Sequence, residues 1–234
     1  MVNKPRWGWV EVILAYAATM LVVTIYGWYV APYLTAYFQT GPVGNFFLAF
    51  LLQFLCLVGF TYLLAAGLSR GSWHDLGVKW VSASSFFRYG LAGGLGLTIL
   101  ILILSIPIQY FQPQLEPQYF ETMLRSTQDL ASIVLILIIG TVLGPFSEEL
   151  FYRGMLYPVC RRYLGPVGGA ILAGAIFGVA HWDLWRTIPL AIGGMTLCYF
   201  YEKTGSILVT TLAHGVWNGI MSLMLFSTLL ATCL

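Results

Sequence analysis

The sequence predicts an all-α protein, a polytopic transmembrane helix bundle of seven or eight spans. Of its 234 residues, 59% are hydrophobic and only 9% are charged, against about 25% charged residues in an ordinary soluble domain. The mean hydropathy is +0.83. Apolar stretches long enough to cross the hydrocarbon core of a bilayer as helices recur along the chain. Composition and stretch length together therefore predict membrane helices.

Seven apolar stretches are the predicted spans, and turn-forming residues separate them. The first is too long for the apolar part of a signal peptide, so we expect a retained helix. Pro32 and Gly41-Pro42 mark the first loop. If the last stretch breaks near Leu223, the number of spans becomes eight. The predicted spans are, in order, 9–31, 43–67, 88–110, 131–158, 167–181, 186–201 and 206–230.

The segments between the spans predict the orientation. The 69–87 loop is amphipathic, which predicts a surface helix or interfacial segment. Because positive charge collects on the cytoplasmic side, we expect a multi-pass protein of the plasma (inner) membrane with a cytoplasmic N-terminus. Arg125 and Arg186 are the cations of the opposite side. The side with the N-terminus holds Lys4, Arg6, Arg70, Lys79, Arg88, Arg161, Arg162 and Lys203.

Composition also excludes other classes of protein. The formal net charge is +2, and no basic run alternates with aromatic residues, so we expect no nucleic-acid partner. The four cysteines have neither CxxC nor zinc-finger spacing, which favours free thiols over a disulfide framework. The expected partners are membrane lipids.

Three charged residues interrupt the fourth span. Glu148, Glu149 and Arg153 lie within ten residues of the sequence Gly144-Pro-Phe-Ser-Glu-Glu-Leu-Phe-Tyr-Arg153. On insertion scales each such charge costs roughly 2.5 kcal/mol or more at the bilayer centre. Ionisable residues at membrane depth therefore predict a functional site, and their partners need to be found.

Helical spacing separates the two glutamates. Glu149 and Arg153 are four residues apart with the acid first, so they share a helix face in the order that favours a pair. Glu148 points about 100° away and lacks a cation on its own helix. We therefore predict that Glu149 is a supporting residue and that Glu148 is the free carboxylate, which can act as a general base towards water.

Other polar residues reach a similar depth from two further spans. His214 and Asn218 are four residues apart on the last span, and both can donate hydrogen bonds to a developing oxyanion. His181 ends the fifth span and shares a face with Phe177. At 1.5 Å per residue, these groups and Glu148 lie roughly 12 to 20 Å from the cytoplasmic ends of their spans. One site can therefore contain them all.

The ordered motifs Glu148-Glu149-xxx-Arg153, Phe177-xxx-His181 and His214-xxx-Asn218 resemble the CPBP (CAAX protease and bacteriocin-processing, or Abi) family of intramembrane glutamic endopeptidases. The family includes the type II CAAX prenyl endopeptidases. The segment Asp75-Leu-Gly77 also resembles a stretch often found before the family core. One position differs, because Trp185 stands four residues after His181, where some members have Asn or Asp.

The resemblance implies an integral membrane endopeptidase that needs neither metal nor cofactor and acts on a membrane-tethered or membrane-inserted peptide or protein. It makes Glu148, His181, His214 and Asn218 the catalytic residues: the first two would activate water, and the last two would stabilise the oxyanion. Glu149 and Arg153 would support them. The implied regions are N-terminal helices with an amphipathic loop over 1–129, a catalytic core over 130–222 and a C-terminal helix end over 223–234.

Other functions agree with the same residues. A non-catalytic membrane scaffold or immunity protein could retain the fold. Two Glu and two His could also bind Zn²⁺ in a metal-dependent membrane protease, although the compact HExxH spacing is absent. A proton-coupled transporter could use the carboxylates, but the sequence lacks the inverted repeat that is typical of many transporters.

Overall fold

The computed structural model describes residues 4–127 and 129–232, with only the backbone described for 228–232. These residues form helices and connecting loops without a strand, which confirms the predicted all-α bundle. Residues 233–234 of the predicted C-terminal helix end, and residues 1–3 and 128 of the predicted N-terminal region, lie outside the described residues.

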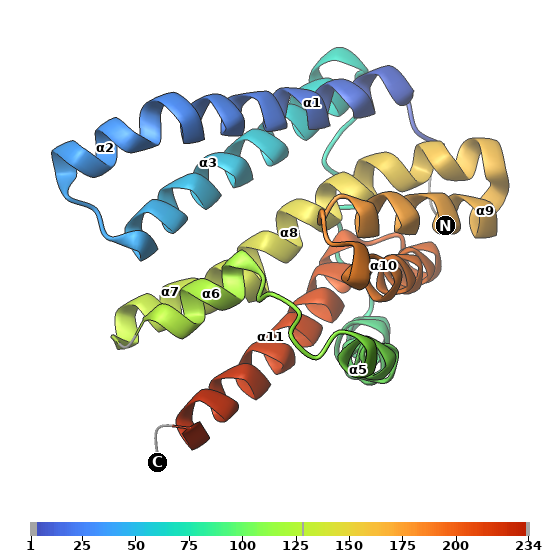
Figure 1. The fold of residues 1–234 in the computed structure, drawn as a ribbon. Helices are drawn as coiled ribbons and strands as arrows, with labels where there is room; N and C mark the ends of the chain where they lie inside the picture. The colour runs from blue at the N-terminus through green and yellow to red at the C-terminus, as the bar shows by residue number, and fades with distance from the viewer. Residues whose placement is uncertain (1–3, 128, 233–234) are drawn as a thin grey trace.

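Two long helical rods form one side of the bundle (Figure 1). The first contains α1 (Trp9–Ile25), a π-helical turn η1 (Tyr26–Val30) and α2 (Ala31–Phe38). The second contains α3 (Pro42–Tyr62) and η2 (Leu63–Leu68), and it runs back along α1. Pro42 starts α3 at the first helical position, where the missing N–H of proline costs nothing.

The other side of the bundle is built around the last helix. A third rod contains α4 (Ala83–Ser85), η3 (Phe86–Ala92) and α5 (Gly93–Phe111), and it packs along α11 (Ile207–Thr232). The short α6 (Tyr119–Ser126) lies beside α7 (Leu130–Ile138) and α11. Helix α11 is continuous, so the alternative of a break near Leu223 is wrong.

A single helical run carries the three charged residues of the fourth predicted span. It consists of α7 (Leu130–Ile138), η4 (Ile139–Leu143), α8 (Gly144–Glu149), η5 (Leu150–Leu156) and α9 (Tyr157–Val179). The wider π-helical turn η4 precedes Pro145, whose ring would otherwise displace the carbonyl one turn earlier. The helix therefore continues through the proline to Glu148 and Glu149.

The run reverses direction inside α9. Gly165 has φ 72° and ψ 178°, a conformation that favours glycine, and the chain turns back there in a helical hairpin (Figure 1). The two arms touch closely, because a Cβ added to Gly169 would lie 2.7 Å from the Arg161 backbone. This reversal separates the predicted spans 131–158 and 167–181.

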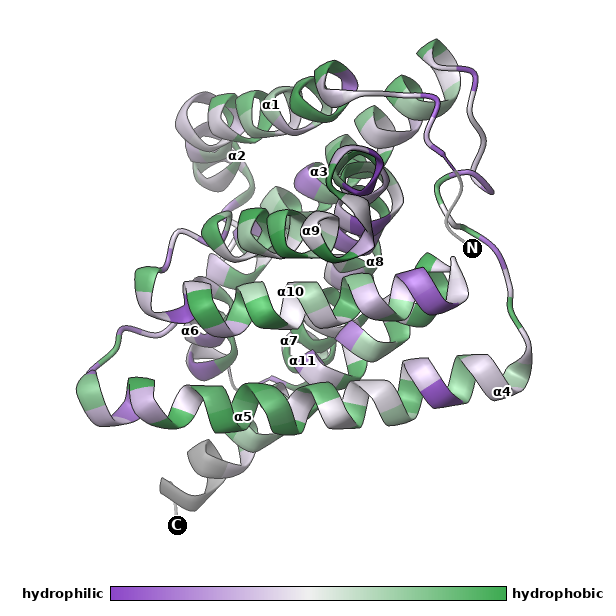
Figure 2. Ribbon diagram, turned by 90° about the vertical axis from the view of Figure 1, so that its right-hand side faces the viewer, coloured by the Kyte–Doolittle hydropathy of each residue, from purple (hydrophilic) through white to green (hydrophobic). Residues whose placement is uncertain are grey.

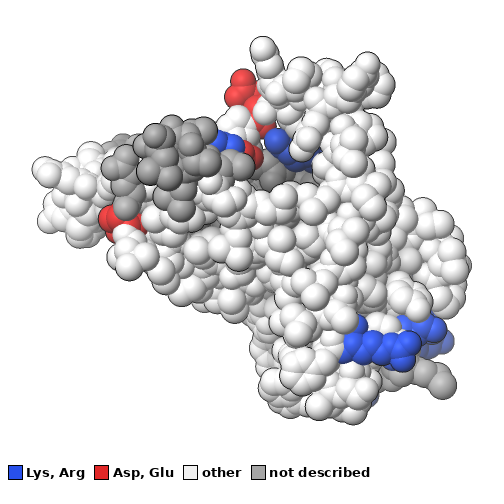
Figure 3. All heavy atoms as spheres, turned by 90° about the horizontal axis from the view of Figure 1, so that it is seen from below, with Lys and Arg blue, Asp and Glu red and all other residues white. Residues whose placement is uncertain are grey.

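Within the described part of the chain, five helical stretches are long and apolar enough to cross a membrane. They are Trp9–Phe38, Pro42–Leu68, Ala83–Phe111, Leu130–Val179 and Ile207–Ser227. The fourth contains the hairpin and so two predicted spans. Helix α10 (Leu184–Thr204), the predicted sixth span, is not among the five, and it packs along α9. Apolar residues predominate along α5 (Figure 2), and most of the face in Figure 3 is uncharged, as expected for an integral membrane protein.

The loop before α4 enters the bundle. Residues 70–82 are not helical, so the surface-helix alternative is wrong there, whereas the interfacial segment stays a prediction. Leu76 is fully buried, and its carbonyl packs so closely on Gly154 that a Cβ there would lie 2.6 Å away. The Gly77 carbonyl accepts a hydrogen bond of 2.9 Å from the Ile207 N–H. The Asp75-Leu-Gly77 segment thereby connects η5 to the start of α11.

Helices α9 and α10 approach through glycines. A Cβ added to Gly174 would lie 2.6 Å from the Ala191 carbonyl oxygen and 2.8 Å from the Met195 nitrogen. Small residues let helices approach closely in lipid, where packing drives association. Since backbone atoms fill the space, only glycine fits at this position.

We predict that Gly174→Ala lowers the stability of the folded chain by about 1 to 3 kcal/mol, the usual cost of overpacking. Thermal unfolding in detergent measures the change. Gly59→Ala is the matched control, because nothing lies within 4 Å of its added Cβ and alanine favours the helix. Equal unfolding temperatures for the two variants would contradict the close α9–α10 contact.

Candidate active site

Three residues from two helical segments form a buried polar cluster. Glu149 and Arg153 come from the α8–η5 run, and His214 comes from α11. Their exposed fractions are 0%, 1% and 3%. Charged groups are almost never so deeply buried unless they are paired. The contacts among the three are therefore the centre of the candidate site.

One carboxylate oxygen accepts two hydrogen bonds. Arg153 Nη1 donates to Glu149 Oε1 over 2.7 Å, which confirms the predicted pair. His214 Nδ1 lies 2.9 Å from the same oxygen, and because a carboxylate only accepts, Nδ1 carries the proton. Glu149 therefore fixes the ring orientation of His214 and leaves Nε2 as the ring nitrogen that faces away from Glu149.

Backbone and aromatic groups complete the cluster. Arg153 Nη2 donates to the Gly194 carbonyl of α10 over 3.1 Å, and its guanidinium lies 4.7 Å from the Phe177 ring centroid. Trp217 stacks on His214 with ring centroids 5.2 Å apart. Sequence reasoning missed Gly194, because a backbone carbonyl has no signature in sequence, and it missed Trp217, which is three residues after His214.

Glu148 lies at the edge of the cluster. Its side chain is 29% exposed, whereas that of Glu149 is fully buried. Glu148 Oε2 is 3.9 Å from His214 Nε2, the ring atom that Glu149 leaves free. The adjacent glutamates thus differ in environment as helical phase predicted: Glu149 is buried in a pair, and Glu148 is accessible.

His181 and Asn218 lie beside the cluster without touching its carboxylates. His181 Nδ1 donates to the Phe177 carbonyl over 2.8 Å. The Phe177 ring separates the two histidines, with ring centroids 4.8 Å from His181 and 5.8 Å from His214. Among the described residues, His181 makes no ion-pair contact with Glu148 within 4.0 Å.

Asn218 connects α11 to the helix that carries the glutamates. Its Nδ2 donates to the Gly140 carbonyl over 2.9 Å, which leaves a second N–H on the same amide. Gly140 lies in the π-helical turn η4, whose geometry exposes carbonyls to such partners. Asn218 therefore has a packing contact in addition to any role towards a substrate.

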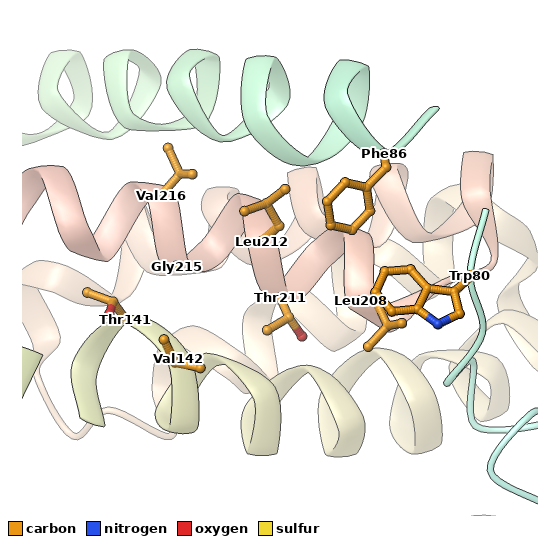
Figure 4. A pocket seen from close by; sticks show the side chains of 9 residues that line it. All are labelled: Trp80, Phe86, Thr141, Val142, Leu208, Thr211, Leu212, Gly215 and Val216. Carbon is orange, nitrogen blue, oxygen red and sulfur yellow. The ribbon is translucent and has the colours of Figure 1, made fainter. Parts of the chain in front are cut away.

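An apolar groove runs along α11 next to the cluster (Figure 4). Its volume is about 430 Å³. Thr141, which follows Gly140 in the sequence, lines the groove, and so do Leu212 and Gly215, which lie before and after His214 on α11. Gly215 packs against the η4 backbone, since an added Cβ would lie 2.3 Å from the Thr141 oxygen. Trp80 and Phe86 close one end of the groove.

Among the described residues, no three His, Cys, Asp or Glu side chains lie close enough together to bind a metal ion. Cys56, Cys160 and Cys198 are free thiols, as the cysteine spacing predicted. The Glu149 carboxylate and the Arg153 guanidinium each keep one buried polar atom, Oε2 and Nε, without a protein partner. Such atoms are typical sites for buried water.

Comparison with known proteins supports the resemblance that the motifs predicted. Residues 130–220 match the family model described as "Type II CAAX prenyl endopeptidase Rce1-like". This region contains the six candidate site residues, so the resemblance is confirmed over the region that contains the site. They are Glu148, Glu149, Arg153, His181, His214 and Asn218. No solved structure matches the chain.

Three curated proteins are also similar to this chain. "Putative membrane peptidase YdiL" of Bacillus subtilis is 24% identical over 64% of this chain and 57% of its own length. "Uncharacterized protein YyaK" of Bacillus subtilis is 26% identical over 56% of this chain and 46% of its own. "Uncharacterized 24.3 kDa protein" of Escherichia coli is 24% identical over 62% of each chain. The match therefore spans roughly half of these relatives.

We predict that Arg153→Ala lowers the free energy of unfolding by about 3 to 5 kcal/mol, because it leaves the buried Glu149 carboxylate without its cation. Folded yield and thermal unfolding in detergent measure the loss. Arg162→Ala is the control, because Arg162 is exposed on the same hairpin. A variant at Arg153 that is as stable as the control would show that the pair does not hold the site together.

Proposed function

We propose that this protein is an integral membrane endopeptidase that hydrolyses peptide bonds with water activated by Glu148. The observation that carries the proposal is the position of His214, which binds the buried Glu149 through one nitrogen and faces the accessible Glu148 through the other. The match of residues 130–220 to the Rce1-like family supports the reaction class.

The proposed reaction needs no reactant other than the peptide and water. The Glu148 carboxylate takes a proton from a water molecule, and the resulting hydroxide adds to the carbonyl carbon of the scissile bond. The proton then passes to the leaving nitrogen as the C–N bond breaks. One water is consumed, and a carboxylate and an ammonium group are released, since the proton of the new carboxylic acid passes to the amine.

The other residues take distinct parts in this proposal. His181 holds the water against Glu148 from the end of α9, which agrees with the absence of direct contact between the two described side chains. A protonated His214 donates from Nε2 to the oxyanion while Nδ1 stays bound to Glu149. Asn218 adds its second amide N–H. Glu149 and Arg153 hold the imidazole in place.

The proposed substrate is a membrane-tethered or membrane-inserted peptide or protein. Leu212 and Gly215 of α11 line the apolar groove, so an apolar segment of a substrate can lie on the helix that carries His214 and Asn218. The distribution of Lys and Arg favours a plasma (inner) membrane protein with a cytoplasmic N-terminus. In that orientation the α9–α10 turn lies on the side opposite the N-terminus.

Glu148→Gln is the decisive variant. We expect it to fold normally and to lower cleavage by at least about 100-fold, since the amide cannot accept the proton. Terminal fragments identified by proteomics in cells with the unchanged chain and in cells with the variant measure the effect. Glu121→Gln on α6, where the side chain is partly exposed, is the control and should cleave normally. Equal fragment sets for the unchanged chain and Glu148→Gln would rule out the proposal and favour a scaffold.

Removal of metal ions distinguishes the glutamate mechanism from a metal-dependent one. We expect purified protein treated with strong chelators to cleave at its full rate, because Glu148 and His181 activate the water without a metal ion. The cleavage rate is measured before and after chelation. A loss of activity that Zn²⁺ restores would contradict the mechanism while leaving the peptidase assignment intact.

A further inference from the structure

A second, polar pocket opens at the turn between α9 and α10. Its volume is about 320 Å³, and charged or polar side chains make up most of its wall. Since a water molecule occupies about 30 Å³ of liquid volume, the pocket has room for on the order of ten. The lining residues are Glu116, Pro117, Gln118, Tyr119, His181, Trp182, Asp183 and Arg186.

His181 belongs both to this pocket and to the candidate site. Its Nδ1 is bound to the Phe177 carbonyl, so Nε2 is the ring nitrogen left for other contacts. Behind it, the Phe177 ring contacts His214 and covers Arg153. The pocket is therefore one aromatic ring away from the buried cluster.

Arg186 closes one side of the pocket. Its Nη1 pairs with the Asp183 carboxylate, and its Nη2 donates to the Glu116 carbonyl over 3.0 Å. Asp183 also caps α10 by accepting from the Arg186 backbone N–H. Arg186 thus ties the 112–118 segment to the α9–α10 turn.

Asp183 stays charged at neutral pH. Burial acts to raise the pKa of Asp183, but hydrogen bonds from the backbone and guanidinium of Arg186 outweigh burial, so the pKa lies below its ordinary value. A folded-state pKa that is lowered keeps the pair intact above the acidic range and weakens it as pH falls through that pKa. The tie is therefore present under ordinary conditions.

Hydrolysis requires a route by which water reaches the site and charged products leave it. The reaction consumes water and releases a carboxylate and an ammonium group, and such charged groups cross an apolar environment only at high cost. The groove on α11 is apolar, so it suits the apolar part of a substrate. The pocket at His181 is lined by groups that can hydrate ions.

We propose that the pocket at the α9–α10 turn is the entrance for water and the exit for the charged product end, and that Arg186 is the latch that holds the 112–118 segment beside it. The role of the pocket in catalysis rests on the proposed function. Access of small molecules to the pocket and the hold of Arg186 on the 112–118 segment do not rest on it, and both can be measured without a substrate.

The first experiment measures access. His181→Cys in the full chain is treated in detergent with a small charged methanethiosulfonate, and the labelling rate is recorded. We expect measurable labelling that rises about tenfold when Arg186→Ala is added, because the 112–118 segment is released. Arg125→Ala is the matched control: it removes another arginine from an ion pair, outside the pocket.

Two results would overturn the entrance and the latch. If His181→Cys stays unlabelled with and without Arg186, the pocket does not admit polar molecules. If Arg186→Ala and Arg125→Ala change the rate equally, Arg186 is not a latch. Gln118→Cys, on the rim of the pocket, provides the same measurement if the His181 variant does not fold, and the unsubstituted chain gives the background of the native thiols.

The second experiment connects the entrance to activity. Gln118→Cys is modified to completion with a bulky maleimide, and we expect cleavage to fall about tenfold because the route is blocked. Tyr110→Cys, which is 80% exposed at the end of α5 and outside the pocket, is the control. Unchanged cleavage after modification of Gln118→Cys would exclude the entrance role. A wild-type chain without cleavage would contradict the proposed function and leave the labelling result standing.

Discussion

The arrangement of the site depends on one buried carboxylate oxygen. Glu149 Oε1 accepts from Arg153 within its own helical run and from His214 on α11. Arg153 in turn binds the Gly194 carbonyl of α10. Three helical elements therefore meet at one charge in a low-dielectric interior, where a charge without partners is costly. The positions of the accessible groups follow from this network.

Two π-helical turns shape the backbone around the network of Glu149, Arg153 and His214. A π-helical turn precedes Pro145, and another carries Arg153. Such turns leave carbonyls available, and two are used: Asn218 binds Gly140, and the Trp7 indole N–H binds the Met155 carbonyl over 2.9 Å. The Asp75-Leu-Gly77 segment packs on η5 and pairs with the start of α11. Packing from a distant loop thus holds the helices that carry the network.

One opening lies along α11, and another of different character lies at the α9–α10 turn. The groove along α11 is apolar, and the pocket at His181 is polar. A peptide cut in a membrane needs both, because its apolar part stays in lipid while the reacting bond takes up water. The adjacent glutamates divide in the same way: one is fully buried in a structural network, and the other is accessible to water.

The sequence by itself determined the helical class, the approximate spans, the Glu149–Arg153 pair and the different environment of Glu148. These properties depend on local periodicity: apolar length sets the spans, and spacing by four residues sets a helix face. It also identified His181, His214 and Asn218 as candidates. Their catalytic roles remain predictions.

Only the tertiary structure decided which of these groups touch. His214 binds Glu149 and faces Glu148, whereas Asn218 binds the Gly140 carbonyl and His181 lies behind Phe177. The burial of Leu76 and the pairing of Arg186 with the Glu116 carbonyl were likewise beyond the sequence. These contacts join residues far apart in the chain, many through backbone atoms that every residue has. Packing of one helix on another therefore determines them, and no local pattern encodes it.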